Sequence, residues 1–372
     1  MVAVLVAATF TLTGCGSGTR LSTDRRAPPV VHALPGRLRV DVYRADAAGD
    51  LSPVVRHDPA LVYVPNSLSN TVDVISQKTM KVIRQFPTGA LPQHVTPAYD
   101  LKTLYVDNDQ GNSLTPINPR TGLPGRPIPV ADPYNLYFTP DGRYAIVVAE
   151  RLQRLDFSDP HTMALEHPLS VPGCAGVDHM DFSANGRYAY ASCEFSGAMI
   201  VVDLRDLRVI QTLRLRGGNA MPQDVKLSPD GRTLYVADMH NNGVWEFAMD
   251  PRLRLERFLP TGAGAHGLYP SRNARVMYVS NRTAGTISVV SFETKKIVAT
   301  WRLPAPASPD MGGVSADGRT LWLSGRYNSV VYAINTTTGR LRATIPVGNG
   351  PHGLCVWPQP GRYSLGHTGI LR

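Results

Sequence analysis

The chain has 372 residues, of which 43% are hydrophobic and 18% charged, with 33 glycines, 31 prolines and a formal net charge of +9. Turn-forming residues at this density exclude a bundle of long helices, and the hydrophobic content excludes a disordered chain. The positive charge forms no dense basic cluster interleaved with aromatic residues, so the sequence does not favour nucleic acid as a partner.

The first 15 residues form an apolar segment that ends in Leu12, Thr13, Gly14 and Cys15. This ending resembles the lipobox of bacterial lipoproteins, whose cysteine becomes the lipidated N-terminus, and the segment is too short to span a bilayer. We expect residues 1–15 to be a signal segment with lipidation at Cys15, residues 16–36 a flexible tether, and residues 37–372 one extracytoplasmic domain anchored at the membrane surface. An ordinary secretory signal, giving a secreted or periplasmic protein, is the alternative.

A pattern then recurs along most of the chain. Each copy has an apolar strand, a turn, a strand such as "TLYVAD" and two further strands; four of the turns are Asp-Gly or Asn-Gly, which suit tight hairpins. An aromatic or apolar anchor in the second strand recurs every 41 to 45 residues, at Tyr63, Tyr105, Ile146, Tyr190, Tyr235, Tyr278 and Trp322. This period is typical of a four-stranded propeller blade. The sequence therefore predicts an all-β fold, a seven-bladed β-propeller of four-stranded blades.

The closure of the ring is predicted from the C-terminal part. Residues 350–357, "GPHGLCVW", repeat the start of a blade once more. We expect this segment to supply the innermost strand of the first blade. Residues 37–57 also have the pattern of a hairpin, so an eight-bladed ring with a split blade is the alternative.

The phrases "VYVPN", "LYVDN", "LYVAD" and "MYVSN" resemble the YVTN family of β-propeller repeats, found in bacterial and archaeal surface and periplasmic proteins. The resemblance covers residues 51–357 and implies the fold; it carries little about function, because propellers host many activities. Relatives by fold include lactonases, the haem d1 domain of nitrite reductase and the copper-bearing propeller of nitrous oxide reductase. None of their signatures is present here as a contiguous motif.

One polar residue comes just before the first strand of each blade, on the face where the inter-blade connections lie. We expect these residues to surround the mouth of the central channel and to bind a ligand: His94, Asn135, His179, Asp224, His266, Asp310 and His352. Four of them are histidines, His94, His179, His266 and His352, and neutral imidazole suits a transition metal. The alternative is that these residues are ordinary repeat positions where the chain turns inward, with no cofactor.

Other motifs are weaker. Gly262, Gly264 and Gly267 spell GxGxxG, but the segment joins two blades and opens no helix, as a dinucleotide loop must. Cys174 precedes the first strand of one blade and Cys193 ends its second strand, so both should lie on the mouth face. The sequence allows either a disulfide between them or two free thiols. The absence of CxxCH excludes covalent c-type haem by this pattern, and GxSxG, HExxH and SxxK are missing.

The repeat thus accounts for nearly every notable residue and leaves no separate catalytic set. We expect a monomeric binding or scaffold module whose channel mouth meets an envelope protein, a polymer or a small ligand. The alternative is an enzyme that uses the channel histidines, either a lactonase-like hydrolase or a metal- or haem-dependent redox protein. A weaker alternative is binding of a polyanion or single-stranded nucleic acid through the positive surface.

Overall fold

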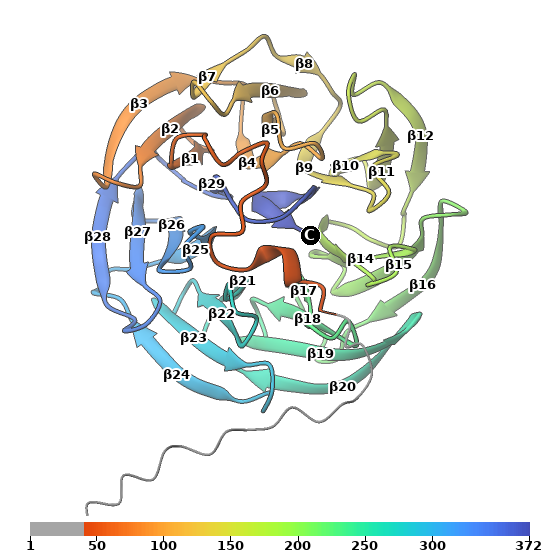
Figure 1. The fold of residues 1–372 in the computed structure, drawn as a ribbon. Helices are drawn as coiled ribbons and strands as arrows, with labels where there is room; N and C mark the ends of the chain where they lie inside the picture. Colours follow the sequence, from red (N-terminus) through yellow and green to blue (C-terminus); the bar gives the residue numbers. More distant parts are fainter. Residues whose placement is uncertain (1–40) are drawn as a thin grey trace, which may run out of the picture. The chain divides into compact units, whose positions relative to one another are not determined.

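The computed structural model describes residues 41–372, which consist almost entirely of short antiparallel strands arranged around a central axis (Figure 1). The predicted signal segment, Cys15 and the tether lie outside the described residues. Seven sheets make up the ring, so the prediction of a seven-bladed propeller is confirmed. Among residues 41–372, the two helices are single 3-10 turns, η1 (Arg44–Asp46) and η2 (His367–Gly369), and no helix there is long and apolar enough to cross a membrane.

Each blade is built from four strands that run from the channel outward, and the first four blades in chain order share this plan. The first blade consists of β29 (Cys355–Trp357), β1 (Leu61–Asn66), β2 (Thr71–Ser76) and β3 (Lys81–Pro87), and the second of β4 (Pro92–Pro97), β5 (Leu104–Asn108), β6 (Ser113–Asn118), β7 (Leu123–Pro124) and β8 (Ile128–Pro129). The third blade consists of β9 (Pro133–Phe138), β10 (Ala145–Ala149), β11 (Arg154–Ser158) and β12 (Leu165–Ser170). The fourth consists of β13 (Val177–Phe182), β14 (Tyr188–Cys193), β15 (Ala198–Asp203) and β16 (Arg208–Arg214).

The remaining three blades follow the same order. Their strands are β17 (Pro222–Leu227), β18 (Thr233–Asp238), β19 (Gly243–Asp250) and β20 (Arg252–Pro260); β21 (Ala265–Pro270), β22 (Val276–Asn281), β23 (Thr286–Ser291) and β24 (Ile297–Arg302); and β25 (Pro309–Val314), β26 (Thr320–Gly325), β27 (Val330–Asn335) and β28 (Leu341–Pro346). Only the second blade has a divided outer strand. There β7 and β8 both pair with β6, because prolines 124, 127 and 129 remove backbone donors that a continuous strand would use.

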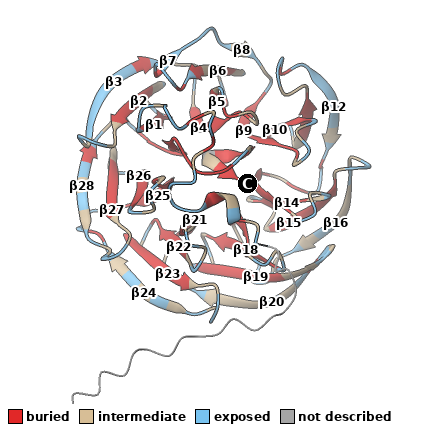
Figure 2. Cartoon of the chain, in the orientation of Figure 1, coloured by how far each residue is buried: buried red, intermediate tan, exposed pale blue. Residues whose placement is uncertain are grey.

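Burial decreases from the channel outward (Figure 2). The innermost strands β4, β9, β13, β17 and β25 are buried along their whole length, whereas β24 alternates between intermediate and exposed residues. The inner strands have neighbouring blades on both faces, and the outer strands border solvent. The predicted anchors, such as Tyr63, Tyr190 and Trp322, are at most 1% exposed, because they fill the space between adjacent blades.

The C-terminal segment closes the ring as predicted. Strand β29 pairs antiparallel with β1, with Trp357 opposite Leu61 and Cys355 opposite Tyr63. The eight-bladed alternative is wrong in the described part of the chain: residues 41–57 contain η1 and an isolated bridge from Leu51 to Gly361, but no hairpin. That segment has too few alternating apolar positions to form a sheet face of its own, and it lies on the ring instead.

Both ends of the described chain cover the face that carries the turns between first and second strands (Figure 1). The N-terminal segment donates from Val42 N to Pro229 O (3.0 Å) and from Gly49 N to Ala316 O (2.9 Å), and both acceptors belong to such turns. The tail forms β30 (Ser364–Gly366) and β31 (Ile370–Leu371), and β30 pairs with β9 in the third blade. The channel is therefore capped on this face.

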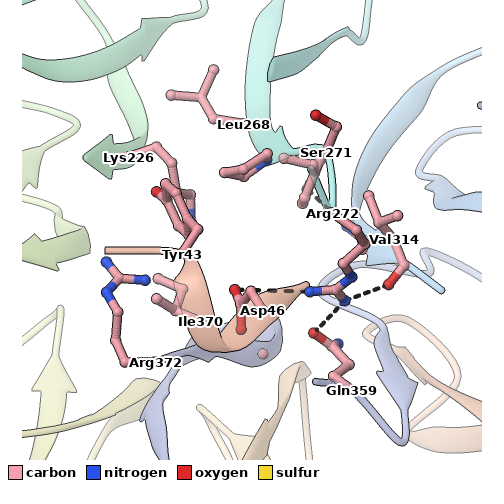
Figure 3. Close-up of a pocket in the computed structure, with 15 residues that line it drawn as sticks. Tyr43, Asp46, Lys226, Leu268, Ser271, Arg272, Val314, Gln359, Ile370 and Arg372 are labelled. Carbon is pink, nitrogen blue, oxygen red and sulfur yellow. Dashed lines mark hydrogen bonds and ion pairs between the residues drawn. The ribbon is translucent and has the colours of Figure 1, made fainter. Parts of the chain in front are cut away.

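An arginine of the sixth blade joins the two capping segments (Figure 3). Arg272 donates to the carbonyl of Val314 (2.6 Å) and to Gln359 Oε1 (3.1 Å), and it lies 3.8 Å from Asp46 Oδ2. The N-terminal segment and the tail thus share this partner at the edge of a small cavity, which Tyr43, Lys226 and Arg372 also line.

Candidate functional site

The seven predicted site residues occupy equivalent places at the start of the innermost strands, apart from His352, which comes just before β29. All seven are at most 3% exposed: His94, Asn135, His179, Asp224, His266, Asp310 and His352. The structure brings them together around the axis, as expected. They lie inside the channel and not at its mouth, because the next ring of side chains covers them.

The four predicted histidines converge. The ring centroids of His94 and His352 are 4.9 Å apart, those of His94 and His179 5.4 Å, and those of His179 and His266 6.3 Å. A fifth histidine that the sequence did not indicate, His367, enters from the capped face, with its ring centroid 4.6 Å from that of His179 and 5.1 Å from that of His94.

His367 belongs to η2 in the tail, outside any repeat, so its position could not be read from the blade pattern. Its backbone has φ of +39°, in the left-handed region that costs free energy for a residue with a side chain. Its Nδ1 lies 3.2 Å from Asn135 Nδ2, and its ring stacks on Tyr137 with centroids 5.8 Å apart. Packing of the tail on β9 thus holds a strained histidine in the channel.

The five histidines divide into two groups of potential metal ligands. In the first group, His94, His179 and His367 each offer a ring nitrogen within 4.8 Å of the other two. A tetrahedral zinc site needs nitrogens about 3.3 Å apart, given Zn–N distances near 2.0–2.1 Å, and this separation falls within the 4.8 Å limit. The second group consists of His266, Asp310 and His352.

Hydrogen bonds orient the rings of the first group. His94 Nδ1 donates to the carbonyl of Tyr134 (2.9 Å), which leaves Nε2 as a lone pair, and this atom has no partner among the described residues. Asn135 Nδ2 donates toward Nδ1 of both His179 (3.0 Å) and His367 (3.2 Å). The other nitrogen of each of these two rings faces a carboxylate, Asp178 at 3.1 Å and Asp224 at 3.7 Å, without hydrogen-bond alignment.

His94 has the arrangement that is common around metal-binding histidines, with one nitrogen bound to an acceptor and the other without a partner. Burial lowers the pKa of His94 to about 3, despite its hydrogen bond to Tyr134. Burial also holds the pKa of His179 and of His367 well below the ordinary range, and neighbouring rings add to the shift. The imidazoles are therefore neutral at pH 7, the form that binds metals.

The second group is less suited to a cation. Arg282 donates from Nε (2.8 Å) and Nη2 (2.5 Å) to Asp310 Oδ1, which neutralises this carboxylate. His266 Nδ1 contacts the same oxygen at 3.2 Å and Met311 Sδ at 3.0 Å. With its carboxylate bound to Arg282, this group offers a cation no net negative charge. The first group lies beside Asp178 and Asp224, and the buried Lys226 has its Nζ 3.9 Å from Asp224 Oδ1.

Asp224 mainly stabilises the contact between two blades of the propeller. Its two oxygens accept from the backbone N–H groups of Val225 and Leu268, each at 2.8 Å, so the carboxylate joins the fifth and sixth blades. This predicted ligand-binding residue therefore has a structural task, and only its 3.7 Å approach to His367 Nε2 links it to the first group.

A second ring of side chains forms the actual mouth. In most blades the residue after the second strand donates its N–H to the connection into the first strand, as from Arg282 N to Gly264 O (2.7 Å). These residues are Ser67, Asp109, Glu150, Glu194, Met239, Arg282 and Arg326. Acidic residues come from three consecutive blades and arginines from two others, so the mouth has an acidic side and a basic side.

The acidic side lies next to the first histidine group. Burial raises the pKa of Glu150 to about 8, with repulsion from Glu194 as the next cause. Burial also raises the pKa of Asp178 well above its usual range, and Glu194 and Glu150 increase the shift. Crowded carboxyl groups of this kind gain stability when a cation is placed among them.

Close backbone approach is required beside His94. A Cβ atom added to Gly353 would lie 2.0 Å from His94 Cδ2, so only glycine fits at this position. Gly353 also donates to the Gln93 carbonyl (2.9 Å) and accepts from Val95 N (2.9 Å), which ties the closing segment to the second blade. The Pro-His-Gly sequence thus places two histidines, His352 and His94, side by side.

Cys174 and Cys193 form a disulfide in the structure, with Cα atoms 4.8 Å apart, while Cys355 is buried and free. Without reductant, we expect denatured protein to yield a peptide pair linked through Cys174 and Cys193 in mass spectrometry. The loop of 19 residues predicts that reduction lowers the free energy of unfolding by about 3 kcal/mol. The double variant C174A/C193A is the control, since reductant should not change its stability; alkylation of both cysteines before reduction would contradict the bond.

Comparison with known proteins agrees with this architecture. A 6-phosphogluconolactonase from Erwinia tasmaniensis is 24% identical over 271 residues, which cover 66% of this chain and 81% of that protein. Two solved structures have the same fold: hydrazine synthase of Kuenenia stuttgartiensis, with a TM-score of 0.65 and 16% identity over 78% of this chain and 95% of that one, and a putative 6-phosphogluconolactonase from Bacteroides uniformis, with a TM-score of 0.62 and 17% identity over 80% and 99%. The model of the YNCE-like β-propeller family matches residues 40–360. The chain belongs to the YNCE-like β-propeller family.

Proposed function

We propose that the protein is an extracytoplasmic binding protein whose channel holds one divalent first-row transition-metal ion on His94, His179 and His367. The observation that carries this proposal is His94 Nε2, a buried lone pair with no hydrogen-bond partner in the described chain, beside two further neutral imidazoles. Imidazole ligands suit zinc, copper, iron and nickel, so the donor set does not select among them. The ion would replace the two hydrogen bonds from Asn135.

The location is supported by the disulfide between Cys174 and Cys193, since such bonds persist in oxidising compartments. The lipobox-like ending at Cys15 and the positive net charge favour attachment to the outer side of a membrane. With one end of the channel capped, a ligand or an envelope partner would meet the metal from the mouth.

The test is the metal content of protein purified without a histidine tag. We expect close to one equivalent of a single transition metal per chain by elemental analysis, and a lower melting temperature after chelation. Adding Zn²⁺ back to the chelated protein should restore the melting temperature, because the ion binds the folded state only. Protein that is metal-free as purified, takes up no added metal and melts unchanged after chelation would contradict the proposal.

A second candidate is a lactonase-like hydrolase. It is favoured by the relatives named 6-phosphogluconolactonase and by the basic side of the mouth, where Arg282 and Arg326 are placed to meet a polar substrate. A metal in the channel would supply a Lewis acid and a bound water of lowered pKa. Hydrolysis of a panel of simple lactones that disappears on chelation would support this candidate over binding alone.

A further inference from the structure

The basic side of the mouth contains a guanidinium that lacks a counter-ion. Arg326 follows β26, and its Nη1 donates to Ser67 Oγ (3.0 Å) and to the carbonyl of Gly350 (3.2 Å). No described carboxylate lies within 4 Å of Arg326, whereas Arg282 is paired with Asp310. These two contacts, one to a side chain and one to the backbone, fix the Arg326 side chain, and its Nε and Nη2 have no hydrogen-bond partner among residues 41–372.

These two donors are available to a ligand. Arg326 is mostly buried, and burial lowers its pKa although nearby Asp310 favours the charged form. A guanidinium stays charged in proteins and must retain its hydrogen bonds when it leaves water. Its planar donors match a carboxylate or phosphate group in two parallel hydrogen bonds.

The neighbouring residues leave a net positive charge at this point. Arg282 uses Nε and Nη2 on Asp310, while its Nη1 makes only long contacts, to Met239 Sδ (3.6 Å) and the Tyr327 hydroxyl (3.5 Å). Tyr327 is 70% exposed, so the site borders solvent on the accessible face. The charge of Arg282 is cancelled by Asp310, and the charge of Arg326 is not.

We infer that the basic side of the channel mouth is an oxyanion site, in which Nε and Nη2 of Arg326, assisted by Nη1 of Arg282, hold the carboxylate or phosphate group of a small ligand. The anion site follows from Arg326 alone. Its use as the anchor of a ligand whose other end reaches the metal rests on the proposed function. The second histidine group, His266 and His352, then lines the space between anion and metal.

The experiment measures binding of inorganic phosphate and of acetate at constant ionic strength, by calorimetry and by the shift in melting temperature. We expect phosphate, acetate or both to bind the native protein, and R326Q to weaken that binding at least tenfold. R326K should retain part of the affinity, because it keeps the charge and loses the two parallel hydrogen bonds. R232Q is the matched control, since Arg232 is exposed on the capped face.

The anion with the higher affinity shows whether the ligand of this site carries a phosphate group or a carboxylate group. Each measurement is repeated on chelated protein and on H94Q. Phosphate binding that persists without metal supports the anion site even where the metal proposal fails. An R326Q protein with normal metal content shows that loss of anion binding in this variant does not come from loss of the metal. Equal affinity of R326Q, R232Q and native protein for both anions, with R326Q and R326K folded by circular dichroism, would overturn the inference.

Discussion

Replacing His94 with glutamine is expected to lower the affinity of the channel for its metal at least 100-fold. Loss of a residue that merely orients a ligand costs about 10 to 100-fold, and His94 would be a ligand itself. The amide of glutamine cannot offer the buried lone pair that His94 Nε2 presents. Metal content by elemental analysis and Zn²⁺ titration of the chelated protein measure the effect, and H367Q should behave alike.

His352 provides the matched control for this experiment. It occupies the equivalent place before β29, is equally buried, and its ring centroid is only 4.9 Å from that of His94. We expect H352Q to keep the metal, because the carboxylate of Asp310 on its side of the channel is already bound by Arg282. Equal metal loss in H94Q and H352Q would show that the channel does not distinguish the two groups.

Replacing Trp357 with alanine is expected to lower the free energy of unfolding by about 3–5 kcal/mol, the usual cost of removing a buried aromatic side chain. Trp357 is fully buried in β29, where it packs in the core of the first blade and donates from Nε1 to Asp58 Oδ2 (2.9 Å). The strand closes the ring, so its loosening exposes both neighbouring blades. Urea unfolding at equilibrium measures the change.

Two further variants make this result specific. W357F keeps most of the apolar volume and should lose about 1 kcal/mol with the hydrogen bond to Asp58. F195A, at a side chain that is 65% exposed, should stay within about 0.5 kcal/mol of the native protein. A W357A protein as stable as F195A would mean that ring closure does not depend on β29.

Much of the fold could be predicted because each blade repeats one short pattern. The recurring anchors fall between blades, and the extra half-repeat at residues 350–357 becomes the closing strand β29. The described residues 41–57 form no hairpin for a local reason: a few alternating residues resemble a strand, but a strand forms only where a sheet edge accepts it, and β29 already fills that place.

The site was predicted in part. Equivalent repeat positions converge on the axis, so His94, His179, His266 and His352 were expected to meet, and they do. The sequence could not assign His367, because its place depends on the tail packing against β9.

The sequence by itself determined the number of blades, the strand that closes them and the channel residues that belong to the repeats, because these follow from a periodic pattern of local interactions. Only the tertiary structure decided which histidines form a group, which carboxylates and arginines stand beside them, and which face is capped. These depend on contacts between segments hundreds of residues apart, such as His367 with Asn135, and on burial, which keeps the imidazoles neutral.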